Sequence, residues 1–307
     1  MPTKRYALRI FRLFGISVYL HWTWFLAFFV LASLPREYNS VGWNIMEVLA
    51  LFFIVLLHEF GHQLACRQTG GQTHDIVLWP MGGVAYVSPP PRPGAQLWSI
   101  AAGPLVNVIL APLFALVVSF SNHLDWSFSY PNLFTWVHVV YYINITLLVF
   151  NMLPIYPLDG GQILRSILWF FLGKANSLRV ASLIGFAGAC FVVFYAIQHQ
   201  WLWLGTLMVF VLIQCWQGFK QSGILKSRDQ LPRREDCLCP FCKAAPVIGN
   251  VWRCPQCHSN LDPFASQGAC PGCNFPFNTM QCLECGNRSP LPAWRQAPIP
   301  PVISSSP

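Results

Sequence analysis

Charged side chains are scarce in this sequence. Aspartate, glutamate, lysine and arginine make up 10% of the 307 residues, whereas a soluble domain has roughly 25%. Acidic residues are the rarer kind, with 11 against 19 basic ones, and hydrophobic residues reach 54%. This composition excludes an ordinary soluble domain and indicates several membrane-spanning segments.

Cysteine is nearly absent from the apolar part of the chain. Three of the twelve cysteines precede residue 220, and the other nine lie between Cys237 and Cys285. Most of those nine form C-x-x-C pairs, which are typical of zinc ligands in a reducing compartment and not of a disulfide framework. Residues 220–307 carry 9 basic and 5 acidic side chains, a balance that makes nucleic acid an unlikely partner.

Six apolar runs have the length of a membrane-spanning helix, about 20 residues. The first is too long for the apolar part of a secretory signal, so we expect it to be retained. Lysine and arginine concentrate in alternate loops, which predicts that both termini are cytoplasmic. A further short helix is expected over residues 162–173. The six predicted spans cover residues 13–34, 45–65, 98–120, 133–153, 180–198 and 201–218.

Two shorter apolar runs flank Gly82 and Gly83 between the second and third spans. They are too short to cross a membrane, and glycines between apolar runs predict a β-hairpin. We expect this hairpin to dip into the membrane, where its edge strand could pair with an unwound substrate. The fold class is therefore an α-helical polytopic membrane protein of about six spans, with a membrane-associated β-hairpin and a small Cys-rich zinc-ribbon domain.

The second span contains an H-E-x-x-H pattern made by His58, Glu59 and His62. Histidines four apart lie on one face of a helix, so both can bind one zinc ion while the glutamate takes a proton from zinc-bound water. Ionisable groups inside a membrane are costly and are functional candidates by default. The alternatives are a structural histidine pair and a proton-relay glutamate of a transporter.

Asp159 is the candidate for the third ligand. Pro154 and Pro157 end the fourth span and force an extended segment before Asp159. Irregular backbone at membrane depth must be buried in protein or line a wet cavity. Two histidines and one carboxylate, with water as the fourth ligand, form a catalytic zinc set. The alternative is a plain Asp-Gly-Gly turn.

The tail holds four C-x-x-C pairs, enough for two closed tetrahedral structural zinc sites. In chain order the first four and the last four cysteines form one site each, and a crossed grouping is the alternative. Cys237 and His258 are left over and are interpreted as bystanders. The eight predicted ligands are Cys239, Cys242, Cys254, Cys257, Cys270, Cys273, Cys282 and Cys285.

Composition predicts four parts along the chain. They are a membrane core over residues 1–219, a basic linker over 220–236, a double zinc-ribbon-like domain over 237–288 and a disordered proline-rich tail over 289–307. We expect the ribbon-like domain to contact protein or a second copy of the chain. The sequence predicts no particular oligomeric state.

Three motifs in order make residues 10–220 resemble the site-2 protease family of intramembrane zinc metalloproteases. They are the H-E-x-x-H pattern, the stretch from Ala102 to Asn107, and the stretch from Asn151 to Gly161. The resemblance implies that His58, His62 and Asp159 bind zinc and that Glu59 is the general base.

Other residues take roles only from this resemblance. It implies that Asn107 and Asn151 lie near the site and hold or polarise substrate, although Asn107 alone is equally consistent with a helix–helix hydrogen bond. The hairpin with Gly82 and Gly83 resembles the family's membrane-inserted substrate-binding segment. His21 resembles a first-span histidine of the sporulation-type subgroup, and an interfacial histidine beside tryptophans is the alternative. The PDZ and CBS domains that often regulate relatives are not recognised, and the Cys-rich tail lies outside the resemblance.

The function hypothesis is hydrolysis of a peptide bond within or near a transmembrane helix of a membrane protein. It requires one catalytic zinc and predicts two structural zincs, contact with membrane lipid and a location in a bacterial or archaeal cell membrane. Two rival hypotheses are a zinc transporter or sensor, and a non-cleaving scaffold that signals through its zinc-ribbon tail.

Overall fold

The computed structural model describes residues 6–294 except 35, 37, 39, 81 and 267. The chain divides into two compact units, Met1–Ser222 and Gly223–Pro307. Each unit has its own core and is described separately below.

The first unit begins with β-strands where the sequence predicted a helix. β1 (Ala7–Leu13) and β2 (Ile16–His21) form an antiparallel pair, and only Trp22–Ser33 forms helix α1. Ile16 and Val18 are fully buried and alternate with less buried residues, which is the two-residue period of a strand. The predicted helix from Leu13 is therefore wrong in its first half. The 12 residues of α1 extend about 18 Å, less than the bilayer core.

The hairpin predicted around Gly82 and Gly83 is present and belongs to a larger sheet. β3 (Gln72–Trp79) and β4 (Gly82–Ser88) pair in antiparallel register, and β3 also pairs in parallel with β2. The strand order is β1-β2-β3-β4. β4 is consequently an edge strand, with one side paired to β3 and the other side free of strand partners in the described chain.

Four helices of the described chain are long and apolar enough to cross a membrane. The helix predicted over residues 162–173 and the span predicted over 180–198 are one element in the structure, broken at Gly173, whose φ of 75° and ψ of 172° are not helical. The six-span count stays a prediction. The four helices are α2 (Val41–Gln68), α3 (Pro93–His123), α5 (Pro131–Met152) and α6 (Asp159–Gln198), with α4 (Trp126–Ser129) before α5 and α7 (Leu202–Asp229) after α6.

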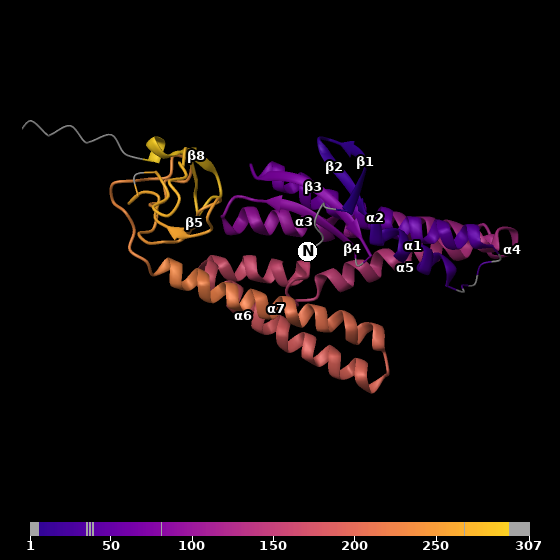
Figure 1. Cartoon of the computed structure of the whole chain (residues 1–307). Coiled ribbons are helices and arrows are strands. Elements are labelled where there is room, and N and C mark those ends of the chain that lie inside the picture. Colours follow the sequence, from indigo (N-terminus) through magenta and orange to yellow (C-terminus); the bar gives the residue numbers. More distant parts are fainter. Residues whose placement is uncertain are drawn as a thin grey trace, which may run out of the picture. The chain divides into compact units, whose positions relative to one another are not determined.

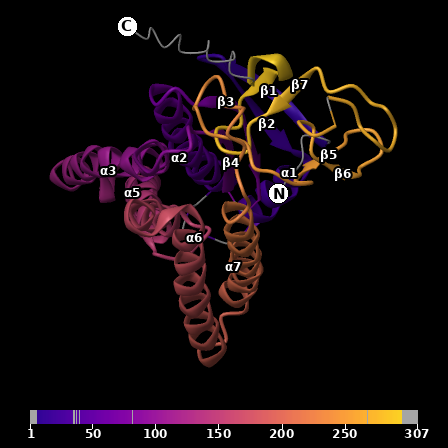
Figure 2. The same ribbon diagram turned by 90° about the vertical axis from the view of Figure 1, so that its left-hand side faces the viewer.

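Helices α2, α3 and α5 lie side by side in both views of the molecule (Figure 1, Figure 2). A small residue permits the close approach of α2 and α3. A Cβ atom added to Gly61 would lie 2.6 Å from the carbonyl oxygen of Ala102. Small residues at membrane helix interfaces bring backbones together in this way. This contact places the face of α2 that carries His58 and His62 directly against α3.

The second unit is a small Cys-rich body with short strands. Its core contains Trp252, Met280 and Trp294 beside several cysteines. Two predicted boundaries were wrong. Residues 220–229 of the predicted linker continue helix α7, and residues 291–294 of the predicted disordered tail form a short 3-10 helix that buries Trp294. Residues 295–307 lie outside the described residues. The strands are β5 (Trp252–Arg253), β6 (Asn260–Leu261), β7 (Thr279–Gln281) and β8 (Arg288–Pro290).

Candidate active site

The structure brings His58, His62 and Asp159 together. The Nε2 atoms of the two histidines are 3.1 Å apart, and Asp159 Oδ2 lies 2.9 Å from His58 Nε2 and 3.3 Å from His62 Nε2. The two histidines come from one face of α2, and all three residues are largely buried. Ligands about 2.0–2.1 Å from a tetrahedral ion would lie about 3.3 Å from one another, so the spacing suits one small cation.

A backbone carbonyl fixes which ring nitrogen of His62 carries a proton. The carbonyl oxygen of Ser99 lies 2.9 Å from His62 Nδ1. A carbonyl oxygen only accepts hydrogen bonds, so Nδ1 of His62 must donate. In a neutral ring this leaves Nε2 with a free lone pair.

A chain of two asparagines fixes His58 in the same way. Asn144 Nδ2 donates to the backbone carbonyl of Asn107 at 3.0 Å, which turns its Oδ1 toward Asn107 Nδ2 at 2.9 Å. The remaining amide oxygen of Asn107 therefore faces His58 Nδ1 at 2.7 Å and accepts its proton. Both asparagines are fully buried. His58 Nε2 is thereby left as a lone-pair donor.

When both rings are neutral, three lone-pair atoms therefore converge, and this arrangement is repulsive unless a cation or a shared proton lies between them. Two imidazoles, one carboxylate and a remaining open position form the ligand set of a catalytic zinc. The donor chemistry and the spacing therefore fit zinc.

Gly103 of α3 leaves room for the two imidazoles. A Cβ atom at this position would lie 2.3 Å from His62 Nε2 and 2.8 Å from His58 Nε2. Such distances are far below van der Waals contact, so only glycine fits without displacing a ring. The stretch from Ala102 to Asn107 therefore supplies both the space for the ligands and the hydrogen-bond acceptor for His58.

Glu59 lies between α2 and the edge strand β4. Its Oε2 accepts a hydrogen bond from the backbone N–H of Ala85 at 2.9 Å. A Cβ atom on Gly83 would lie 2.5 Å from Glu59 Cγ, so Gly83 allows the strand to rest on this side chain. Gly82 has open space around it and a φ of 130°, a conformation that favours glycine at the turn.

Asp159 occupies the first position of α6. The preceding Pro154–Pro157 segment lies outside the helices, as its prolines predicted. A carboxylate at the N-terminus of a helix is stabilised by the helix dipole. A Cβ atom on Gly160 would lie 2.4 Å from the carbonyl oxygen of Met152, and one on Gly161 would lie 2.4 Å from the backbone nitrogen of Tyr156. Both glycines therefore fix the position of Asp159.

The other predicted site residues differ in where they lie. Asn107 contacts His58 and Asn144 through the two ends of its amide, and its predicted contact with substrate stays a prediction. Asn151 lies in the last turn of α5. His21 caps α1, where its Nδ1 accepts from the backbone N–H of Thr23, so its described contacts are local.

Sequence reasoning missed Asn144, although a lone amide in an apolar span was a usable signal.

We expect Asn144→Ala to weaken zinc binding at the membrane site by about 10–100-fold, the range seen when an outer hydrogen-bond partner of a ligand is removed. The reason is that Asn107 loses the contacts that orient its amide toward His58. Competition with a chelator measures the change. Asn122→Ala, on an exposed position of α3, is the matched control. Equal zinc affinity in both variants would contradict the role of Asn144.

The tail cysteines form two sets of four that differ from the grouping in chain order. Within each set all sulfur atoms lie within 4.8 Å of one another. Neighbouring sulfurs are 3.5–3.7 Å apart, near the roughly 3.8 Å edge expected of a tetrahedral zinc–thiolate site. The first pair joins the last, and the second joins the third. The outer set is Cys239, Cys242, Cys282 and Cys285, and the inner set is Cys254, Cys257, Cys270 and Cys273.

Ser259 favours thiolates in the inner set. Its hydroxyl lies 3.0 Å from Cys257 Sγ and 3.5 Å from Cys270 Sγ. These hydrogen bonds lower the pKa of Cys257 and lower that of Cys270 to about 6. Cys237 is buried and His258 is exposed, and neither belongs to the two sets.

Double substitutions can test this grouping. Cys239→Ser with Cys285→Ser removes two ligands of one set, and we expect the loss of one zinc per chain. Cys239→Ser with Cys254→Ser damages both sets, and we expect the loss of two. If the first four and the last four cysteines formed the sets instead, the first double variant would lose two zincs and the second would lose one. Zinc counted by mass spectrometry of the purified protein separates these outcomes.

Comparisons with known proteins agree with the geometry of the membrane unit. The family model for peptidase family M50 matches residues 46–130 and 127–195. A zinc metalloprotease of Methanocaldococcus jannaschii is 33% identical over 219 residues, which make up 71% of this chain and 61% of that protein. A putative zinc metalloprotease of Synechocystis is 30% identical over 190 residues, or 58% of this chain and 48% of that protein.

A solved structure is also similar. The site-2 protease from Methanocaldococcus jannaschii matches with a TM-score of 0.51 and 30% identity, over 70% of this chain and 95% of that chain. The chain spans between about half and three fifths of the two curated relatives named above. By the family model, the shared identity and the solved structure, this chain belongs to peptidase family M50, the site-2 protease family of zinc metalloproteases.

Proposed function

We propose that this chain is an intramembrane zinc endopeptidase that cleaves a peptide bond within or near a transmembrane helix of a membrane protein. The observation that carries the proposal is the convergence of His58, His62 and Asp159 beside a glutamate that contacts an edge strand. These groups are buried in helices apolar enough to span a membrane.

Each residue has a distinct task in this proposal. His58, His62 and Asp159 would hold zinc, which when bound lowers the pKa of its water toward about 7. Glu59 takes a proton from the attacking water and returns it to the leaving amine. Asn107 and Asn144 orient His58, and Ser99 orients His62. Asn107 and Ser99 contact the ligand histidines and Asn144 contacts Asn107, so all three are positioning residues.

Strand β4 is the proposed binding site for the substrate backbone. Carbonyls in a helix are shielded by their hydrogen bonds, so the substrate must unwind before attack. The unpaired side of β4 can hold an extended segment by strand addition. Because Gly83 and Ala85 of β4 contact Glu59, this strand would place a substrate peptide beside the general base.

The surroundings of the enzyme complete the proposal. The chain is a multi-pass protein of a microbial cell membrane, in contact with lipid, and its termini are cytoplasmic. The two cysteine sets hold structural zincs, so the full complement is three zinc ions per chain. The Cys-rich unit contacts protein or a second copy of the chain. Along the chain, the membrane core is followed by a linker into which helix α7 extends, then by the ribbon-like domain and the proline-rich end.

Cleavage of a reconstituted substrate is the decisive experiment. Purified protein in detergent or lipid, incubated with a single-span membrane protein, is expected to yield two fragments whose new ends map to the membrane segment. His58→Ala is expected to abolish cleavage and to lower zinc from three to two per chain. Zinc uptake into vesicles without cleavage would favour the transporter. No cleavage, with zinc unchanged in His58→Ala, would favour the scaffold.

A further inference from the structure

The Cys-rich unit contains a groove that none of the proposed chemistry uses. Its volume is about 600 Å³, and it is lined by β5 and β7 together with Phe275, Phe277 and Arg288. Pro255 and Leu283, which lie inside two of the C-x-x-C pairs, also border it. The walls of the groove are therefore tied to both cysteine sets.

The groove is positively charged. Among the residues that the structure describes, Arg253 and Arg288 are the charged residues of its lining, and no acidic residue lines it. Both arginines are exposed. The Nε atom of Arg253 donates to the carbonyl oxygen of His258 at 3.1 Å, which holds the side chain and leaves its terminal nitrogens available.

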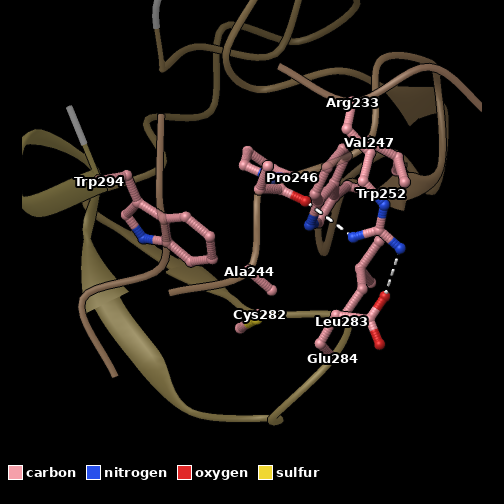
Figure 3. A pocket seen from close by; sticks show the side chains of 10 residues that line it. Arg233, Ala244, Pro246, Val247, Trp252, Cys282, Leu283, Glu284 and Trp294 are labelled. Carbon is pink, nitrogen blue, oxygen red and sulfur yellow. Dashed lines mark hydrogen bonds and ion pairs between the residues drawn. The ribbon is translucent and has the colours of Figure 1, made fainter. Parts of the chain in front are cut away.

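Nearby acidic residues are already paired with other arginines. Glu284 pairs with Arg233 at 3.0 Å, as Figure 3 shows, and Asp262 pairs with Arg234 at 2.7 Å. These carboxylates therefore neutralise cations outside the groove. The charge of Arg253 and Arg288 remains for a ligand.

Residues of two short strands line the same groove. β5 pairs only with β6 and β7 only with β8 in the described chain, so each has a second side without a strand partner. An extended peptide can bond to such an edge through its backbone. Half-buried Phe275 and Phe277, whose ring centroids are 5.7 Å apart, offer an apolar surface for alternate side chains.

We propose that this groove binds an extended acidic peptide. Backbone groups of the peptide pair with a strand edge, apolar side chains contact the two phenylalanines, and carboxylates face Arg253 and Arg288. A single strand of nucleic acid fits less well. Two unpaired arginines would neutralise few phosphates, whereas nucleic-acid affinity depends on many such contacts.

The test uses the full chain in detergent and a fluorescent ten-residue peptide of alternating aspartate and valine. We expect saturable binding by fluorescence anisotropy. A peptide with lysine in place of aspartate should bind at least about tenfold more weakly, since only its charge is reversed. Higher salt should weaken binding of the acidic peptide.

Charge-matched double variants locate the site. Arg253→Glu with Arg288→Glu should weaken binding at least about tenfold, whereas Lys226→Glu with Lys243→Glu, on exposed residues outside the groove, should change it less than about twofold. Unchanged zinc content shows that the variants are folded. If the double variant loses zinc and is therefore not folded, Arg288→Ala is the milder substitution to test. No binding by wild type, equal loss in both double variants, or tighter binding of oligothymidylate would overturn the proposal.

Discussion

Glu59→Gln is expected to lower the rate of substrate cleavage at least about 1,000-fold while all three zincs are retained. General acid–base catalysis contributes about 10²–10⁴-fold, and an amide cannot take the proton of the attacking water. The amide oxygen can still accept the hydrogen bond from Ala85, so the contact between α2 and β4 survives. Fragment formation on a gel, together with zinc content, measures the two effects separately.

Glu47→Gln is the matched control for this change. Glu47 is the other buried glutamate of α2 and accepts a hydrogen bond from Tyr38 at 2.9 Å. Glu47 also forms an ion pair with Arg36. Because Glu47 lies twelve residues from Glu59 and breaking such a pair lowers stability, we expect its substitution to leave cleavage within about fivefold of wild type. Full activity of Glu59→Gln would refute the assignment of the general base.

Gly103→Ala is expected to empty the membrane zinc site and reduce cleavage below detection. The added methyl group would lie 2.3 Å from His62 Nε2, so at least one imidazole must leave its position. Zinc should fall from three to two per chain. The protein should remain folded, because a single methyl group in a close helix contact costs typically 1–3 kcal/mol.

The same substitution elsewhere in α3 controls for helix effects. A Cβ atom on Gly94 would meet only Phe170 Cζ, at an ordinary distance of 3.8 Å. Gly94→Ala should therefore keep three zincs and wild-type cleavage. If Gly103→Ala also kept all three, the close approach of α3 to the histidines would be wrong.

The parts of the site that follow from local spacing could be predicted from the sequence. The two histidines share a face because a helix turns every 3.6 residues, and the prolines before Asp159 end a helix by their own chemistry. The asparagine network could not be predicted in this way. Asn107 and Asn144 are 37 residues apart, and only the packing of α3 against α5 brings them together.

The N-terminal strands and the cysteine grouping were missed for different reasons. Residues 13–34 form one apolar run of spanning length, and nothing in its composition separates the six residues of β2 from the helix that follows, because so short an apolar segment does not distinguish a strand from a helix. The strand conformation of β2 is determined by its parallel pairing with β3, which lies more than fifty residues later in the chain. For the cysteines, four pairs can combine in three ways, and sequence spacing does not choose among them.

The nested grouping of the cysteines also sets an order in which the unit can assemble. Cys257 and Cys270 of the inner set are 13 residues apart, whereas Cys242 and Cys282 of the outer set are 40 apart. Closing the longer loop costs about 1 kcal/mol more in chain entropy. Once the inner loop is closed, fewer flexible residues separate the outer pairs, so closing the outer loop costs less chain entropy. We therefore expect the inner set to bind zinc first during synthesis and the last C-x-x-C pair to be translated to complete the outer set.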